Sequence, residues 1–206
     1  MTSVRLLQAK EAEELYGPRR ETWPEERARW RAGRMAGSTW IRRDGRADSV
    51  QWLDLPGEQE LDLAWVERHY FAWVPRLAGQ AVHPHYLPDG RLELAPWPLD
   101  WPRLIKMAPV VLEQDARHRR RIRPIRGGFL AKPGGSLEFE LLRRPGGRRL
   151  VVAVRALSPR LPLGLYLSVQ TPLHERSTFA FLREVNRRYV AQTLGLVVSQ
   201  QPDGTT

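Results

Sequence analysis

Two segments of the chain carry apolar residues at the spacing of an amphipathic helix. The first opens just after Pro56-Gly57, and its apolar residues recur every three or four positions until Pro75 limits its end. The second opens at Thr171-Pro172, which fits a cap followed by proline in the first turn, and it stops near Gly195. We expect this last helix to cover the apolar face of a sheet.

Between the two helices the pattern changes to that of strands. Leu137, Phe139 and Leu141 alternate with Glu138, Glu140 and Leu142, which predicts a strand with one solvent-exposed face. Pro88-Asp89-Gly90 and Pro145-Gly146-Gly147 are turn signals between neighbouring runs. Short turns of this kind favour antiparallel pairing. The predicted strands cover residues 81–87, 91–95, 103–113, 117–126, 137–142 and 150–157.

The N-terminal quarter of the chain is less regular. Residues 3–16 are typical of a short amphipathic helix, and Thr22 with Glu25 forms a capping box for a second one that runs to about Met35. Asp44-Gly45 is then a turn signal between two strand-like runs, so Trp40–Leu53 is a candidate hairpin.

The predicted fold class is α+β. It consists of an antiparallel sheet of about five to seven strands packed on a C-terminal helix, with N-terminal helices. We divide the chain into an N-terminal extension with a possible first hairpin (1–55), an α+β core (56–198) and a disordered tail (199–206).

Composition narrows the possible classes of protein. With 42% hydrophobic and 27% charged residues among 206, the chain is globular rather than disordered. It has no cysteine, which excludes disulfides, thiolate nucleophiles and cysteine-ligated zinc. No apolar run approaches the ~20 residues of a membrane span, and the charged N-terminus does not match a secretory signal. We therefore expect a cytoplasmic protein.

The net charge of +10 raises the question of an anionic partner. Only three of the 33 basic residues are lysines and the rest are arginines. A GC-rich genome also produces such a preference for arginine at solvated surface positions, without any anionic partner. One segment, 117–126, gathers the charge. Extended, it places Arg117, Arg119, Arg121 and Arg123 on one face about 6.6–6.8 Å apart, a row that suits a nucleic-acid backbone. The other interpretation is a charged strand edge that prevents edge-to-edge pairing.

Candidate chemistry is sparse. His83 and His85 share a face of a strand and, with Glu93 across the hairpin, make a possible metal site, but Pro84 between them disfavours a central strand, and we predict no metal and no cofactor. No catalytic residue stands out. A further possibility, besides the two binding hypotheses given below, is an enzyme that uses His69, Glu113 or His174, although the sequence spacing of these residues does not indicate a catalytic site.

The order of elements from residue 60 to 194 is joined by a set of residues that carry a family likeness: Gly127-Gly128-Phe129-Leu130-Ala131, Leu137-Glu138-Phe139-Glu140, Leu150–Val154, Ser158-Pro159-Arg160-Leu161-Pro162, Tyr166, Gln170 and His174. In these features the chain resembles the START-like, polyketide cyclase-like (helix-grip, SRPBCC) superfamily. A helix-grip domain usually opens with a strand, for which Trp40–Leu53 is the candidate.

The resemblance implies an antiparallel sheet wrapped around a long C-terminal helix, with an apolar cavity between them that binds lipids, polyketides or other hydrophobic molecules. Some members of the superfamily are cyclases or hydrolases, but no shared catalytic residue carries over. The leading hypothesis is therefore non-catalytic binding of a hydrophobic small molecule or lipid; the alternative is binding of nucleic acid or another polyanion through Arg117–Arg126. The candidate ligand-binding residues are Tyr70, Trp73, Trp97, Trp101, Tyr166 and His174.

The tryptophan candidates leave two interpretations open. All eight tryptophans lie between Trp23 and Trp101, and Trp97-Pro98-Leu99-Asp100-Trp101-Pro102 forms an aromatic, proline-rich connection. It suits either the edge of a ligand pocket or aromatic side chains that pin the connection to the core.

Overall fold

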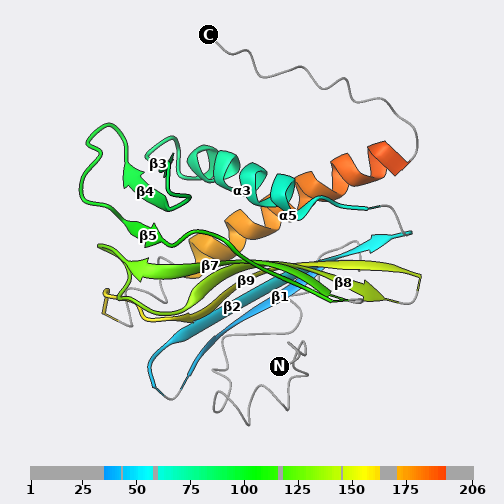
Figure 1. Ribbon diagram of the computed structural model, residues 1–206, viewed down its shortest axis with the longest axis horizontal. Helices are drawn as coiled ribbons and strands as arrows, with labels where there is room; N and C mark the ends of the chain where they lie inside the picture. Colours follow the sequence, from blue (N-terminus) through cyan, green and yellow to red (C-terminus); the bar gives the residue numbers. More distant parts are fainter. Residues whose placement is uncertain are drawn as a thin grey trace.

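The computed structural model describes residues 35–42, 44–57, 60–115, 118–144, 146–162 and 171–193. Within them, nine antiparallel strands form one sheet and two helices pack on the same side of it (Figure 1). The strands are β1 (Met35–Ile41), β2 (Ala47–Pro56), β3 (Val82–Tyr86), β4 (Leu92–Pro96), β5 (Ile105–Met107), β6 (Val111–Gln114), β7 (His118–Gly127), β8 (Ser136–Arg144) and β9 (Gly147–Leu157). The helices are α3 (Leu63–Leu77) and α5 (Thr171–Thr193).

The strand order is β1-β2-β9-β8-β7-β5-β4-β3, and β6 pairs with β7 beside β5. The antiparallel α+β class is confirmed, but the sheet is larger than the predicted five to seven strands. One cause is Pro109: it lies between β5 and β6 and has no N–H to give to a strand ladder. The run 103–113, predicted as one strand, is therefore two, and both pair with the long strand β7.

The hairpin around Asp44-Gly45 forms as predicted, with β1 and β2 paired from Met35 opposite Leu53 to Ile41 opposite Ala47. Strand β2 also pairs with β9 along its whole length, so the hairpin belongs to the same sheet as the later strands. The two predicted helices before residue 35, and the predicted tail after residue 198, lie outside the described residues.

Helix α3 begins later than predicted, because Asp62 is its N-cap: the Asp62 carboxylate accepts a hydrogen bond from the Ala64 N–H at 2.8 Å. Pro75 lies within the last turn instead of ending the helix. Helix α5 agrees with its predicted range. Its Tyr189 hydroxyl donates to the Pro56 carbonyl at 3.0 Å, which ties the end of the helix to the end of β2.

The core lies between the helices and the sheet. We call the side of the sheet that faces α3 and α5 the helix face, and the other side the opposite face. Phe139, Leu150 and Val152 of the helix face are completely buried against Tyr70 and Phe181 of the two helices or their neighbours. The opposite face carries a smaller buried apolar cluster of Val50, Val151 and Ala153.

Candidate functional site

An apolar cavity of about 220 Å³ lies between the helix face of the sheet and the two helices. Strand alternation creates its wall on β4, β5 and β7, because every second residue of these strands faces the helices. The cavity is lined by Ser49, Tyr70, Phe71, Val74, Ala78, Val82, Leu94, Leu104, Ile105, Met107, Ile125, Leu130, Leu137, Val154, Leu157, His174 and Ser177. Four of these side chains carry a polar group, so the lining suits an apolar molecule with few hydrogen bonds.

Three of the four polar groups have clear roles. The Ser49 hydroxyl pairs with that of Thr39 at 2.7 Å and accepts from Gln51 at 2.8 Å. Ser177 donates to the His174 carbonyl of its own helix at 2.7 Å. Burial raises the pKa of Tyr70 to about 12, so its phenol stays protonated. Its ring packs edge-on against Phe139 and Phe181.

His174 is the exception. It lies in the first turn of α5, and its Nε2 atom is buried without a hydrogen-bond partner among the described residues. Burial lowers the pKa of His174 to about 4, so the imidazole is neutral at neutral pH. A buried polar atom without a hydrogen-bond partner lowers the stability of a packed core. In a binding site, such an atom can form its hydrogen bond with the ligand.

Five of the six predicted ligand-binding residues lie in the described part of the chain, and these five do not come together. Tyr70 and His174 line the cavity. Trp73 packs at the edge of the core beside His69, with ring centroids 6.1 Å apart. Trp97 and Trp101 lie in the β4–β5 connection, where they are 65% and 75% exposed and do not line the cavity. Tyr166 lies outside the described residues.

The predicted arginine row has the expected alternation but a different environment. Arg119, Arg121 and Arg123 point to the helix face, where Arg121 and Arg123 contact α3 and Arg119 donates to the Leu61 carbonyl just before that helix. Arg121 donates to Glu67 of α3 at 2.6 Å, and Arg123, whose side chain is 7% exposed, donates to the same carboxylate and to the Gly90 and Ala108 carbonyls. The solvent-facing row that the sequence predicted is therefore not formed by these residues; Arg117 lies outside the described part of the chain.

The opposite face of the same strand carries a second network that the sequence reasoning missed. Arg120 donates to Glu113 at 2.7 Å and to Glu138 at 2.6 Å, and His118 contacts Glu140 at 3.2 Å. The signal was available: Glu138 and Glu140 alternate with apolar residues on β8 and were treated as a solvent-exposed face, yet both are buried. Glu113, a candidate for catalysis, is half-exposed in this network and far from the cavity lining.

A polar cavity of about 240 Å³ lies where β7 begins. Arg119 and Arg148 stand 3.8 and 3.7 Å from Glu60, which is itself 72% exposed. Cationic side chains outnumber carboxylates in the walls, which suits an anion. The lining residues are Glu60, Gln114, Asp115, His118, Arg119, Leu141, Arg143 and Arg148.

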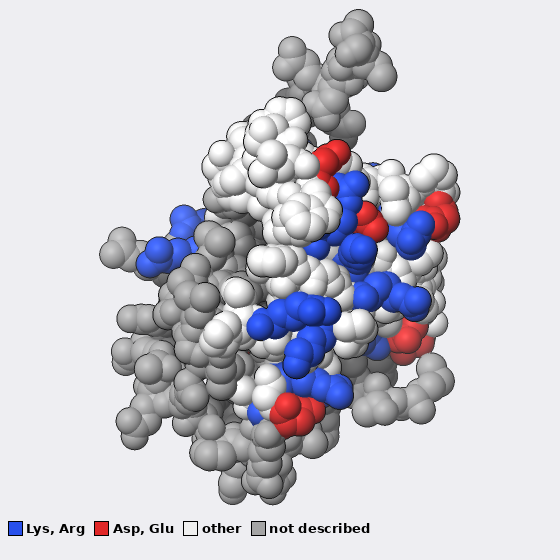
Figure 2. Space-filling model, turned by 90° about the vertical axis from the view of Figure 1, so that its left-hand side faces the viewer, with Lys and Arg blue, Asp and Glu red and all other residues white. Residues whose placement is uncertain are grey.

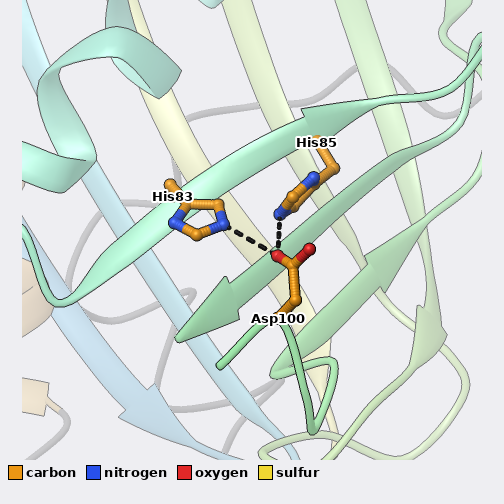
Figure 3. A group of neighbouring side chains, drawn as sticks. All are labelled: His83, His85 and Asp100. Carbon is orange, nitrogen blue, oxygen red and sulfur yellow. Dashed lines mark hydrogen bonds and ion pairs between the residues drawn. The ribbon is translucent and has the colours of Figure 1, made fainter. Parts of the chain in front are cut away.

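At the other end of the sheet, His83 and His85 of β3 converge on Asp100 of the β4–β5 connection (Figure 3). Their Nε2 atoms lie 3.0 and 2.8 Å from the same oxygen, Asp100 Oδ1. The hydrogen bond with His83 is the main cause that lowers the pKa of Asp100, so the carboxylate is ionised. Glu93, the predicted third member, instead pairs with Arg103 at 2.9 Å.

The surface around this end is basic. Figure 2 shows Lys and Arg side chains gathered there, with fewer Asp and Glu between them. Exposed basic residues of the strands and loops at this end include Lys106, Arg126, Lys132 and Arg160. His69, the remaining candidate, stacks on Trp65 with centroids 4.9 Å apart and lines neither cavity.

None of the described helices combines the length and the apolar character needed to cross a bilayer.

No family model matches the chain, and no curated protein sequence matches it. Solved structures give distant likenesses. Protein Ms6760 from Mycobacterium smegmatis aligns at a TM-score of 0.35 and 9% identity, over 70% of this chain and 92% of its own. CalU16 from Micromonospora echinospora aligns at a TM-score of 0.32 and 13% identity, over 80% of this chain and 98% of its own. TM-scores this low do not assign a family, so the helix-grip resemblance stays a prediction.

Proposed function

We propose that the protein binds a small apolar molecule with one hydrogen-bonding group, and that it performs no chemistry on that molecule. The observation that supports this most is the cavity of about 220 Å³, whose walls are almost entirely apolar and which includes His174. Apolar side chains release water when an apolar ligand enters, and a single polar group fixes its orientation.

The size of the cavity limits the ligand. An apolar cavity of about 150 Å³ holds benzene, and pockets for drug-sized ligands begin at about 300 Å³. A cavity of about 220 Å³ lies between these limits. We therefore expect a single substituted ring, or an acyl chain of comparable volume, rather than a full-length lipid or a large polyketide.

The polar group of the ligand is matched to His174. A neutral imidazole offers one N–H donor and one acceptor nitrogen, so a hydroxyl or carbonyl group fits better than a charged one. Among the described lining residues no carboxylate accompanies this histidine, and a neutral, uncoupled imidazole is a weak acid–base catalyst at pH 7 because its pKa is far from that pH. This is why we propose binding rather than catalysis.

The test uses toluene and p-cresol, which differ by one hydroxyl. Native mass spectrometry and solvent extraction of the purified protein first identify any bound molecule, and the two probes are then titrated by calorimetry. We expect p-cresol to bind more tightly, and His174→Leu to remove that advantage of about tenfold, the worth of one net hydrogen bond. Equal affinity of the unmodified protein for both probes contradicts the role of His174.

A cavity-filling variant tests the location. Val74→Phe places extra volume in the lining, and Val111→Phe makes the same substitution on β6, where the side chain is 48% exposed and outside the lining. Binding is expected to be lost in the first variant and kept in the second. If neither probe nor any extracted molecule binds the unmodified protein, the proposal fails.

A second candidate is binding of an anion in the polar cavity at the start of β7. Arg119, Arg143, Arg148 and His118 line it, so it includes Arg119, one of the four arginines of the row that the sequence predicted. A nucleic-acid strand is expected to bind with an affinity that falls linearly on a log–log plot against salt, and a small phosphorylated ligand is expected to bind more weakly as salt screens the charges. Arg143→Gln should reduce that slope, and a fluorescent oligonucleotide and inorganic phosphate are the probes. Absence of binding by both at low salt removes this candidate.

A further inference from the structure

We propose that His83, His85 and Asp100 form a binding site for a divalent first-row transition-metal ion, with Zn²⁺ as the representative. The site is separate from the apolar cavity. His83 and His85 project from one side of β3, whereas Val82 of the same strand lines the cavity on the other side. The inference therefore does not depend on the proposed function.

The three ligand atoms already lie close together. The nitrogen and oxygen atoms that could bind an ion are all within 4.8 Å of one another (Figure 3). Zinc binds imidazole nitrogen and carboxylate oxygen at about 2.0–2.2 Å, which separates tetrahedral ligand atoms by roughly 3.3–3.5 Å. Asp100 Oδ1 is 3.0 and 2.8 Å from the two Nε2 atoms, so an ion needs the carboxylate to withdraw by roughly half an ångström.

The surroundings permit this adjustment. The Asp100 side chain is 57% exposed, so it moves without disturbing the core, whereas the two imidazoles are 22% and 28% exposed and held by the strand. The His85 Nε2 atom is buried and, despite its short distance to Asp100, makes no well-aligned hydrogen bond. A metal ion at the centre of the cluster supplies the missing partner.

The donor set indicates the class of ion. Two imidazoles and one carboxylate suit Zn²⁺, Co²⁺, Ni²⁺ or Fe²⁺ and are a poor set for Mg²⁺ or Ca²⁺, which prefer oxygen ligands. Three protein ligands leave at least one coordination position for water or another ligand, the pattern of zinc sites that act on a bound molecule rather than only stabilise a fold. Trp97, 65% exposed, packs against His83 at a centroid distance of 5.4 Å and stands beside the cluster.

A second layer of contacts positions Asp100. Its backbone adopts a left-handed conformation with φ of 55°, which aspartate tolerates better than most residues. Arg103 donates to the Asp100 carbonyl at 2.7 Å and lies 3.4 Å from the ligand oxygen, Asp100 Oδ1. Arg103 also pairs with Glu93 at 2.9 Å, and this carboxylate offsets the positive charge of the arginine beside the cluster. Arg103 is therefore a positioning residue.

The experiment uses the full chain without an affinity tag, freed of metal by a chelator and then titrated with Zn²⁺ by calorimetry and native mass spectrometry. We expect one equivalent to bind. His83→Ala, His85→Ala and Asp100→Asn should each weaken binding by at least about 100-fold, beyond the 10–100-fold typical of outer-shell changes. Arg103→Gln should fall within that smaller range. Asp100→Asn keeps the left-handed backbone, so a folding defect does not obscure its result.

His118→Asn is the matched control, because it removes an imidazole that contacts Glu140 far from the cluster. It should bind Zn²⁺ as the unmodified chain does. With Co²⁺ as the probe, the visible d–d absorption should appear in the unmodified chain and in His118→Asn, and disappear in His85→Ala. The proposal is overturned if no stoichiometric Zn²⁺ binds, or if Asp100→Asn and His85→Ala bind as tightly as the unmodified chain.

Discussion

The two faces of the sheet both bury charged groups, but they balance them differently. On the helix face, Glu67 of α3 meets Arg121 and Arg123, one carboxylate against two guanidinium groups, and backbone carbonyls complete the bonding of Arg123. On the opposite face, the two buried carboxylates Glu138 and Glu140 meet the guanidinium groups of Arg120 and Arg155, and the half-exposed Glu113 gives Arg120 a further carboxylate.

This difference shows how one arginine-rich strand serves two purposes. Alternation along β7 sends successive arginines to opposite faces. Arg121 and Arg123 on the helix face attach α3 to the sheet, and Arg120 on the other face ties β7 to β6 and β8 within the sheet. A run of basic residues in a sequence is therefore no reliable sign of a basic surface, because these residues can form ion pairs inside the folded protein.

The largest effect is expected from Glu67. Its side chain is 2% exposed and is the only carboxylate that the described contacts give to Arg121 and Arg123. Glu67→Ala leaves two guanidinium groups poorly compensated, and breaking a buried ion pair from one side costs about 3–5 kcal/mol. Urea denaturation measures it. Glu113→Ala, in which the lost carboxylate is 52% exposed, should cost less than about 1 kcal/mol; equal losses would mean that the helix face is not the more demanding one.

An acid-dependent effect of intermediate size is expected from His174 on the helix face. Its pKa is about 4 in the folded protein against 6.5 unfolded, so between these values the unfolded chain binds more protons and the folded state loses stability as pH falls. At about 1.4 kcal/mol per pH unit the total loss from pH 7 to pH 3 is about 3 kcal/mol. Denaturation of His174→Leu over the same range should show a shallower decline; parallel curves for the two proteins would contradict it.

On the opposite face, Glu140→Gln should cost about 1.5–3 kcal/mol, the worth of a hydrogen bond to a charged group. Burial alone would raise the pKa of Glu140, but the hydrogen bond with His118 and the charges of Arg155 and Arg120 outweigh it and hold that pKa below its usual range. Its stabilisation is therefore present above the ordinary pKa of 4.5 and lost as pH falls through the folded value. The difference between the two proteins should shrink in acid, as denaturation at pH 7 and pH 3 will show.

The smallest effect on stability is expected from an exposed ion pair on the outer side of α5. Arg187 on α5 pairs with Glu184 at 2.9 Å but is 68% exposed, and Glu184 keeps a second partner in Arg188 at 2.6 Å. Arg187→Ala should leave the denaturation midpoint unchanged within error. A clear loss of stability would show that the outer side of α5 contributes to the fold as the buried faces do.

Much of the fold could be predicted from local patterns, because hairpin turns and helical periodicity depend on residues that are close together in the sequence. The hairpin around Asp44-Gly45 and the last helix are examples. Pairings between distant segments could not be predicted in this way. The sequence around Arg121 does not indicate that its partner is Glu67. The position of Glu93 opposite His85 favoured Glu93 as the partner of the histidines, and nothing near His85 pointed to Asp100 instead.

The candidate site, too, was predicted only in part. Tyr70 was found because it lies on the apolar side of its helix, and that side faces the cavity; His174 came only from the helix-grip resemblance, and it also lines the cavity. Trp97 and Trp101 were predicted from an aromatic, proline-rich connection, and an aromatic residue in a connection has no periodicity that tells which way it faces. Their exposure beside His83 follows from the path of the β4–β5 connection, a property of the whole chain rather than of its local sequence.

The pairing of β2 with β9 also has a consequence for how the protein is made. Trp52 lies opposite Val151 in the middle of the sheet, so the β1–β2 hairpin waits, during synthesis, for most of the chain to leave the ribosome. Contacts between residues so far apart are slow to form because a long loop must close first. Until then the apolar side of the hairpin is exposed to the cell. Pairing of this kind therefore leaves apolar surface uncovered for longer than the local contacts of a helical protein of equal length do.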